Sequence, residues 1–268
     1  MRFPSRFAAF VLFVLLGTTG LALSGCGSYV VPGSAADFRA LGITAQEQEE
    51  MTDGVIAAAM QRKPAASFPA RIAIARLQGA GYRSHSGYGY GTGTVTLQMN
   101  RDVESEEDFE RLADQAQIAG IAPLNRLVLP NSIRSVDDLR VAAAQVKADM
   151  LLVYTFDTRF GVETIVPVLG TITLGLFPSE ESRVNSTCSL ALIDVRTGYI
   201  YGLGEANARA DQLASGWTSK TAVDQSRRRA EKRAFAGAVD EFVSLWGGVV
   251  SEYHRSPAPI GVRYETAR

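Results

Sequence analysis

Apolar and polar residues follow two different periods along this chain, and the order of the two periods predicts a fold. Alternation with a period of two indicates a strand at 71–77 and an antiparallel hairpin at 189–204. A continuous apolar run at 150–156 is typical of a central strand covered on both faces. Elsewhere apolar residues recur at helical spacing. Each of these stretches begins with a Ser or Thr that is followed three residues later by an aspartate. These predicted helices open at Ser105, Ser135 and Thr221.

The fold class that this order predicts is α/β with some α+β character. It is a mixed β-sheet with βαβ units, an antiparallel hairpin and a long C-terminal helix packed on the sheet. A capping box at 44–47 opens a further helix, which runs to about Arg62 and packs on the main domain. Gly120 ends the helix that opens at Ser105, and Gly247 with Gly248 ends the C-terminal helix.

Two shorter β predictions complete the pattern. The apolar run at 127–130 indicates a short buried strand. Two β segments are predicted at 162–168 and 171–177, with a tight turn between them. Pro178 and a charged group end this excursion, the charged residues being Glu180, Glu181 and Arg183.

The first apolar run has the layout of an export signal. Arg2 and Arg6 precede an apolar core at 7–16, and a segment of small residues follows the core. The core is too short for a membrane span. The run ends at Leu23-Ser24-Gly25-Cys26, which resembles a bacterial lipobox. This resemblance implies cleavage before Cys26 and lipid modification of its thiol and amine; the alternatives are an ordinary signal peptide or an uncleaved anchor.

A lipid anchor determines where the chain works. Two or more acyl chains hold a protein firmly on a bilayer, whereas one chain binds only marginally. Gly27 follows the cysteine in place of the aspartate that retains many lipoproteins at the inner membrane, so the same resemblance favours the periplasmic face of the outer membrane in a Gram-negative source. The predicted organisation is a signal peptide at 1–25, a lipidated tether at 26–43, an N-terminal helix at 44–64, an α/β domain at 65–250 and a loosely held tail at 251–268.

Composition removes several classes of function. Without Arg2 and Arg6 the formal net charge falls from −1 to −3, and no basic block remains to attract nucleic acid. After Cys26 no apolar stretch approaches twenty residues, so no transmembrane helix is predicted. Cys188 has no partner in the chain if Cys26 is acylated, and its place in a strand indicates a buried, inert thiol.

The order of elements resembles a known periplasmic α/β domain. The segments that carry the resemblance are 134–139, which leads through Ala148-Asp149 into the apolar strand 150–153, and 192–198, an apolar strand followed by an Asp-x-x-Thr-Gly turn. This domain occurs in the amino-terminal part of TolB and in the curli secretion lipoprotein CsgG. The resemblance covers about residues 70–246 and implies a domain that is used for assembly.

A second resemblance is to the rhombotarget lipoproteins, a largely uncharacterised bacterial family. It rests on 152–160, on 192–204 and on the stretch from Trp217 to Gly248. The family name reflects a proposed link with rhomboid-type proteases, whose substrates typically end in a glycine-rich motif, an apolar helix and basic residues. Residues 260–268 do not have that form.

Residues that could carry catalysis are scarce. The two histidines, His85 and His254, lie in predicted loops, so no metal site or histidine-based triad is predicted. The glycines at 87, 89, 91 and 93 lack the spacing of a dinucleotide fingerprint, and no cofactor or nucleotide is predicted. Asp157 and Glu163 would need a shared cleft for acid–base work. Asp194 is expected to bond the backbone of its own turn.

The glycine-rich stretch also carries Tyr82, Tyr88 and Tyr90, which could form a contact surface for a protein or a glycan. The main hypothesis is a non-catalytic envelope lipoprotein whose α/β domain binds an envelope protein or itself. One alternative is an oligomeric secretion pore of the curli type that uses the hairpin at 158–177. Another is a substrate of a rhombosortase-type protease system.

Overall fold

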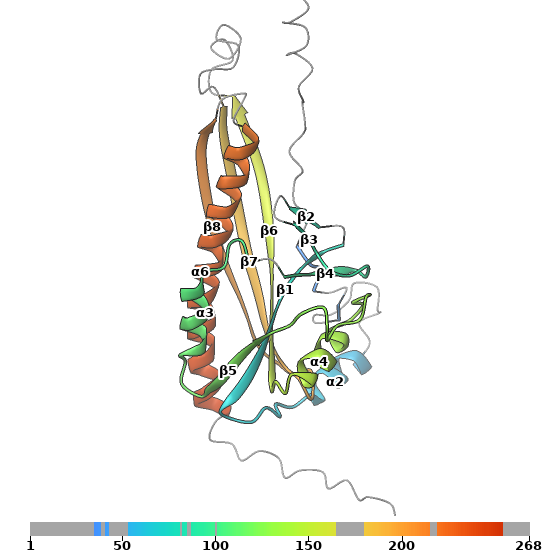
Figure 1. The fold of residues 1–268 in the computed structure, drawn as a ribbon. Coiled ribbons are helices and arrows are strands. Elements are labelled where there is room, and N and C mark those ends of the chain that lie inside the picture. Colours follow the sequence, from blue (N-terminus) through green and yellow to red (C-terminus); the bar gives the residue numbers. More distant parts are fainter. Residues whose placement is uncertain are drawn as a thin grey trace, which may run out of the picture.

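A mixed sheet runs along the whole molecule (Figure 1). The structure is a computed structural model that describes residues 35–38, 41–42, 53–80, 82–84, 87–99, 101–164, 180–214 and 219–253. The strands are β1 (Ala70–Gly79), β4 (Val95–Gln98), β5 (Ile118–Pro123), β6 (Met150–Thr164), β7 (Glu180–Asp194) and β8 (Ile200–Ala214). Their order is β4-β1-β6-β7-β8, and β5 also pairs with β1. The short strands β2 (Arg83–Ser84) and β3 (Gly87–Tyr88) form a separate pair.

The described part of the chain also contains the helices α2 (Asp53–Gln61), α3 (Glu106–Ala113), α4 (Val136–Gln145) and α6 (Ser219–Tyr253). Both β5 and β6 run parallel to β1, and the β6–β7–β8 meander is antiparallel. The predicted fold class, a mixed sheet with βαβ units, an antiparallel hairpin and a long C-terminal helix packed on it, is confirmed.

Two hydrophobic cores lie on the two faces of the sheet, because side chains along a strand alternate between faces. In β1, Ala73 and Leu77 join the core under α4. Ile72 and Ile74 join the core under α3 and α6. This double burial explains the continuous apolar run of β6 between Met150 and Phe156.

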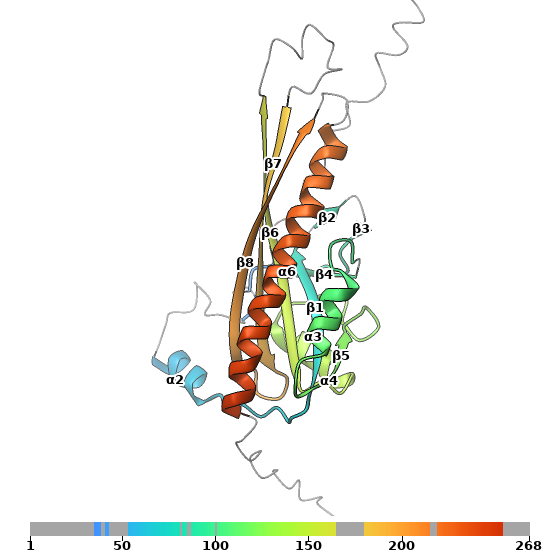
Figure 2. The same cartoon turned by 90° about the vertical axis from the view of Figure 1, so that its left-hand side faces the viewer.

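The meander extends well beyond this double core, and α6 accompanies it along its length (Figures 1 and 2). The three strands have 15 residues each, and α6 has 35. At about 3.3 Å per strand residue and 1.5 Å per helix residue, both span roughly 50 Å. One long helix therefore covers one face of the whole meander.

Small residues on β8 allow α6 to approach closely. A Cβ at Gly202 would lie 2.0 Å from a methyl carbon of Leu245, and a Cβ at Gly237 would lie 3.0 Å from the Cβ of Ala206. Even-numbered positions between Gly202 and Ala210 thus face the helix. Odd-numbered positions from 203 to 211 face the other side of the sheet, where Glu205 and Arg209 are exposed.

Several predicted borders are confirmed. Ser105 caps α3, and its hydroxyl accepts from the amide of Asp108 at 3.2 Å. The aspartate of the second capping motif, Asp138, accepts from the amide of Ser135 at 3.4 Å. The hairpin at 189–204 turns at Gly198, whose φ of +70° suits glycine.

The strand predicted at 127–130 is wrong, because those residues form turns and bends. The strand that completes this part of the sheet is β5, in the segment Ile-Ala-Gly-Ile-Ala-Pro, which shows no clear period in the sequence. Gly120 does not end α3, which finishes at Ala113; it lies within β5 with a φ of +153°. Parallel pairing with β1, a tertiary contact, makes this segment a strand.

Two other predicted ends are wrong. The charged residues Glu180, Glu181 and Arg183 do not end a β excursion but belong to β7, where they pair with β6. Gly247 and Gly248 do not end α6, because Val249 continues its buried stripe. Of the β segments predicted at 162–168 and 171–177, residues 162–164 lie in β6, and 165–177 lie outside the described residues.

The N-terminal predictions are met only in part. Helix α2 covers the second half of the helix predicted at 44–62, and its Ile56 and Met60 are exposed instead of packed on the domain. The described part of the predicted 26–43 tether is packed: Leu41 is buried, and the amide of Ala36 donates to the hydroxyl of Thr155 at 2.7 Å.

The continuity of α6 through its two glycines gives a testable prediction. Gly247→Ala is expected to stabilise the protein by about 0.5–1 kcal/mol, since alanine is favoured over glycine inside a helix and no atom lies within 4 Å of the added Cβ. Chemical denaturation measures the change. Gly198→Ala, at a φ of +70°, is the control and should destabilise. A loss of stability in Gly247→Ala would mean that the helix ends there.

Candidate functional site

The centre of the candidate site is a buried network of charged side chains on one face of the sheet. Arg227 of α6 is fully buried and donates three hydrogen bonds to carboxylates. They run to Glu231 Oε2 at 2.6 Å, to Asp102 Oδ2 at 2.9 Å and to Asp224 Oδ1 at 3.1 Å. One arginine thus joins two turns of α6 to the loop that precedes α3.

Arg76 of β1 is the second cation of this network. Its Nη1 donates to Asp102 Oδ1 and to Glu104 Oε1, both at 3.2 Å. Its Nη2 donates to the hydroxyl of Tyr82 at 3.3 Å and lies 3.7 Å from a carboxylate oxygen of Glu231. The carboxylates of Asp102 and Glu231 therefore each bridge the two arginines.

Strand β6 completes the network. The hydroxyl of Tyr154 donates to Glu104 Oε1 at 2.9 Å, and the hydroxyl of Thr158 donates to Glu231 Oε1 at 2.9 Å. The guanidinium of Arg76 also lies 4.8 Å from the ring centre of Phe156. The buried ion network, as we call these side chains, contains Arg76, Tyr82, Asp102, Glu104, Tyr154, Thr158, Asp224, Arg227 and Glu231.

Burial and charge pairing act in opposite directions on these groups. Burial would lower the pKa of Arg76 and Arg227, but neighbouring carboxylates outweigh it and raise both pKa values, so both arginines stay charged. Burial raises the pKa of Glu231 above its usual range, against the pull of the two arginines. The pKa of Tyr154 is raised by burial and then by Glu104.

Such an arrangement is suited to holding elements together. Each carboxylate is occupied by an arginine or a hydroxyl, and general acid–base work needs a group within reach of a substrate proton. Among the described residues no cluster of His, Cys, Asp and Glu could hold a metal ion. The Nε of Arg76 has no hydrogen-bond partner within the described part of the chain.

A solvent-open groove adjoins the buried ion network. The edge of β1 is shared by β4, which pairs with residues 76–79, and by β5, which pairs with residues 70–74. Where these two strands diverge, the surface is hollowed by adjoining spaces of about 360 and 580 Å³. Arg101, Glu104, Phe109 and Pro123 line both spaces.

The walls of this α3–β5 groove combine a strand edge, an apolar strip and charges. Among the described strands, β5 pairs only with β1, so its outer edge is open. On the opposite wall, α3 contributes the half-buried ring of Phe109 and the exposed Glu106 and Glu110. The guanidinium of Arg101 stacks 4.5 Å from the centre of the Phe109 ring. These features suit an extended polypeptide better than a compact metabolite.

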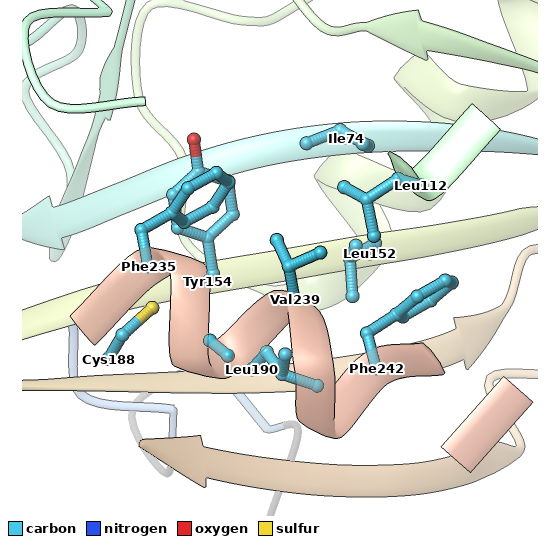
Figure 3. A pocket seen from close by; sticks show the side chains of 10 residues that line it. Ile74, Leu112, Leu152, Tyr154, Cys188, Leu190, Phe235, Val239 and Phe242 are labelled. Atoms are coloured by element: carbon cyan, nitrogen blue, oxygen red, sulfur yellow. The ribbon is translucent and has the colours of Figure 1, made fainter. Parts of the chain in front are cut away.

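A second hollow is closed and apolar (Figure 3). It has a volume of about 10 Å³ and lies between α6, α3 and the sheet, where Tyr154, Cys188 and Phe235 line it. That space holds no ligand larger than a water molecule. Cys188 is buried, as predicted. Burial raises the pKa of its thiol, which disfavours the reactive thiolate.

The structure separates the three tyrosines predicted as one contact surface. Tyr82 is buried in the ion network, so its ring is not available to a partner. Tyr90 is half-buried, and its hydroxyl donates to Asn131 Oδ1 at 2.7 Å. Tyr88 lies in β3, and its side chain is not described. Tyr82 therefore cannot belong to an exposed contact surface, whereas the prediction for Tyr88 and Tyr90 stays a prediction.

The other candidate residues are placed as follows. Asp194 is buried; its Oδ1 accepts from the amides of Arg196 and Thr197, which confirms the prediction for its turn. Asp157 and Glu163 lie six positions apart on β6, which is roughly 20 Å along the strand. Leu23, Ser24, Gly25, Cys26, His85 and His254 lie outside the described residues.

Sequence reasoning missed the buried ion network. The basic residues of the C-terminal helix would be expected on its solvated side, yet Arg227 is fully buried. Two signals were present. Arg76 interrupts the apolar strand 72–77, and Arg227 with Glu231 forms an i, i+4 pair next to the apolar stripe of α6. Neither signal specifies the partner, because Asp102 and Glu104 come from a distant loop.

The described chain thus defines an α/β domain with a buried ion network and an open groove at a sheet edge. No protein-family model matches the sequence, and no curated protein matches it. Among solved structures, a DUF330-family protein from Xanthomonas campestris is similar with 12% identity and a TM-score of 0.34, over 70% of this chain and 91% of that chain. No described helix is long and apolar enough to cross a membrane.

Two further solved structures are similar. One is a candidate lipoprotein from Caulobacter crescentus CB15, with 14% identity and a TM-score of 0.26 over 43% of this chain and 79% of that chain. The other is a hypothetical protein from Chlamydia trachomatis, with 12% identity and a TM-score of 0.32 over 66% of this chain and 96% of that chain.

The network gives a prediction that compares adjacent arginines. Arg227→Met is expected to destabilise the protein by about 3–5 kcal/mol, because it removes the fully buried cation that three carboxylates share. Arg228→Met removes a side chain that is 45% exposed and pairs with the same Asp224, and should cost less than about 1 kcal/mol. Urea unfolding of both variants measures the difference. Equal effects would contradict the assigned role of Arg227.

Proposed function

We propose that this chain is a non-catalytic bacterial envelope lipoprotein, anchored through Cys26, whose periplasmic α/β domain binds an envelope protein in the α3–β5 groove. The observation that carries the proposal is the groove itself, which pairs an open strand edge with an apolar wall beside the buried ion network. The lipobox resemblance at 23–26 supports the anchor. The resemblance to the rhombotarget lipoproteins fits the same setting.

The groove indicates the kind of segment it would hold. Residues 118–122 of β5 offer backbone amides and carbonyls, and Pro123, which lacks an amide, limits the donors at one end. An extended peptide can add to such an edge and place alternate side chains against the opposite wall. Phe109 favours an apolar side chain there, and the exposed carboxylates of Glu106 and Glu110 favour a basic one.

The anchor can be tested with a matched cysteine control. Cys26→Ala is expected to move the protein from the membrane fraction to the soluble fraction, since the acyl chains supply the binding free energy. Cys188→Ala, which removes a buried thiol, should leave the distribution unchanged. Fractionation with immunoblotting measures both, and mass spectrometry shows whether the amino terminus is acylated. An unmodified Cys26 would refute the anchor.

Binding in the groove can be tested by photocrosslinking in the bacterium that produces the protein. Benzoylphenylalanine at Met99 or Glu110, which line the groove, is expected to crosslink one envelope protein at a single short segment. The same group at Leu127, 85% exposed and outside the groove, should not. Glu110→Lys should weaken the Met99 crosslink, and Glu107→Lys on the same helix should not.

Two outcomes would contradict the proposal. Crosslinks of equal yield from Leu127 and Met99 would indicate contact without a specific groove. A Met99 crosslink of unchanged yield in Glu110→Lys would show that the acidic residues of α3 do not contribute to recognition of the partner.

A further inference from the structure

The far side of the sheet carries a second open edge. Strand β8 pairs with β7 along its length, and no other described strand borders it. Its 15 residues make this edge much longer than the six-residue β5. Long open edges are normally shortened, covered or paired, because they present a row of unpaired amides and carbonyls.

Along this edge an acidic and a basic side chain lie at equal distances on either side of the middle of the strand. The exposed side chains opposite α6 include Glu205, Asn207 and Arg209, at every second position. Asn207 is the central residue of the strand Ile200–Ala214, and the acid and the base lie two positions on either side of it. An antiparallel copy of the strand reverses this order, so acid would meet base twice.

We propose that β8 pairs with β8 of a second copy of this chain, antiparallel about a two-fold axis at Asn207. In this register Glu205 of each copy lies opposite Arg209 of the other, on the same face of one continuous sheet. The two strands overlap over their whole length, because the axis passes through the middle of the strand, and pairing is regular except at the irregularity near Tyr201. The interface is isologous, the kind that closes a dimer.

Other registers of the β8–β8 pair are less favourable. An axis at Glu205 or Arg209 places like charges directly opposite each other, and an axis at Ala208 places Glu205 opposite Asp211 twice. An axis at Ala210 pairs Arg209 with Asp211 but overlaps only the last part of the strand, from position 206 onward. Full overlap and opposite charges therefore coincide only at Asn207 among these registers.

The side chains of Glu205 and Arg209 are accessible for pairing with a second copy. Glu205 is exposed and has no salt bridge to any described residue. Arg209 pairs at 2.9 Å with Asp211 of its own strand, and both side chains are at least one-third exposed. The Arg209 carbonyl accepts from Arg233 of α6 at 3.0 Å, which covers one acceptor of the edge. Pairing replaces this bond with a backbone hydrogen bond from the second copy.

Helix α6 borders the proposed interface. A two-fold axis through the edge places both α6 helices on the same face, side by side. The small residues Gly237 and Ala230 face the sheet, where Gly237 lies over Ala206 and Ala230 packs against Ala210 of β8. The guanidinium of Arg233 reaches the Arg209 carbonyl at the edge, so this side chain must turn aside when a second copy pairs there.

Cysteine crosslinking tests the register directly. In the full-length chain, purified in detergent, Asn207→Cys is expected to form a disulfide-linked dimer under mild oxidation, because the two copies of position 207 face each other at about 5.5 Å between Cα atoms. Glu205→Cys is the matched control on the same strand. Its two copies lie roughly 13 Å apart along the paired strands, so it should not crosslink above the unmodified chain.

A charge exchange tests the side-chain pairing independently. Light scattering in detergent should give a dimer for the unmodified chain. Glu205→Arg alone should shift it to the monomer, since it places two arginines opposite each other twice. Adding Arg209→Glu to Glu205→Arg should restore the dimer.

Each outcome supports or overturns the proposal. A monomeric chain with no Asn207→Cys crosslink would overturn it. So would a dimer that crosslinks equally at position 205, or one that Glu205→Arg leaves intact, because either result would place the contact elsewhere. The edge of β8 and the α3–β5 groove lie at opposite edges of the sheet, so a failure here leaves the groove proposal untouched.

Discussion

The salt bridges of Arg227 hold α6 and the loop before α3 in place. A fully buried guanidinium is tolerated only where carboxylates surround it, and here Asp102, Asp224 and Glu231 do so. These partners lie on α6 itself and on the loop before α3. The network therefore fixes both the long helix and the loop that forms one end of the α3–β5 groove.

This constraint links stability to function. Loop residues 101–104 contribute both to the network and to the groove, since Glu104 is bound by Arg76 while Arg101 lies exposed over Phe109. A partner in the groove would meet a rigid wall, which reduces the entropic cost of binding. Every carboxylate of the network already has a hydrogen-bond partner.

The sequence predicted much of the fold but little of the site. Apolar periodicity located β1, β6, the β7–β8 hairpin and α6, and capping aspartates located the starts of α3 and α4. Apolar periodicity did not predict β5, because a segment of Gly and Ala becomes a strand only through pairing with β1. It also failed at Gly247, where buried packing of Trp246 and Val249 carries the helix through two glycines.

The site escaped prediction for a related reason. Charged residues are usually placed on the surface by a sequence pattern, and nothing local indicates that Arg76 and Arg227 meet across the sheet. Tyr82 illustrates the same limit: a tyrosine in a glycine-rich stretch is typical of a contact surface, yet its hydroxyl is held by a buried arginine. Such contacts depend on tertiary structure.

Hydrogen exchange in the native membrane tests most directly whether this domain is a binding platform. Amide exchange would be compared between the chain in membrane vesicles prepared from its source cells and the purified chain in detergent. Slower exchange in vesicles at 106–113 and 118–123, with no change in α6 between Arg227 and Trp246, is the expected result. Equal exchange in the two samples over α3 and β5 would contradict a bound partner in the groove.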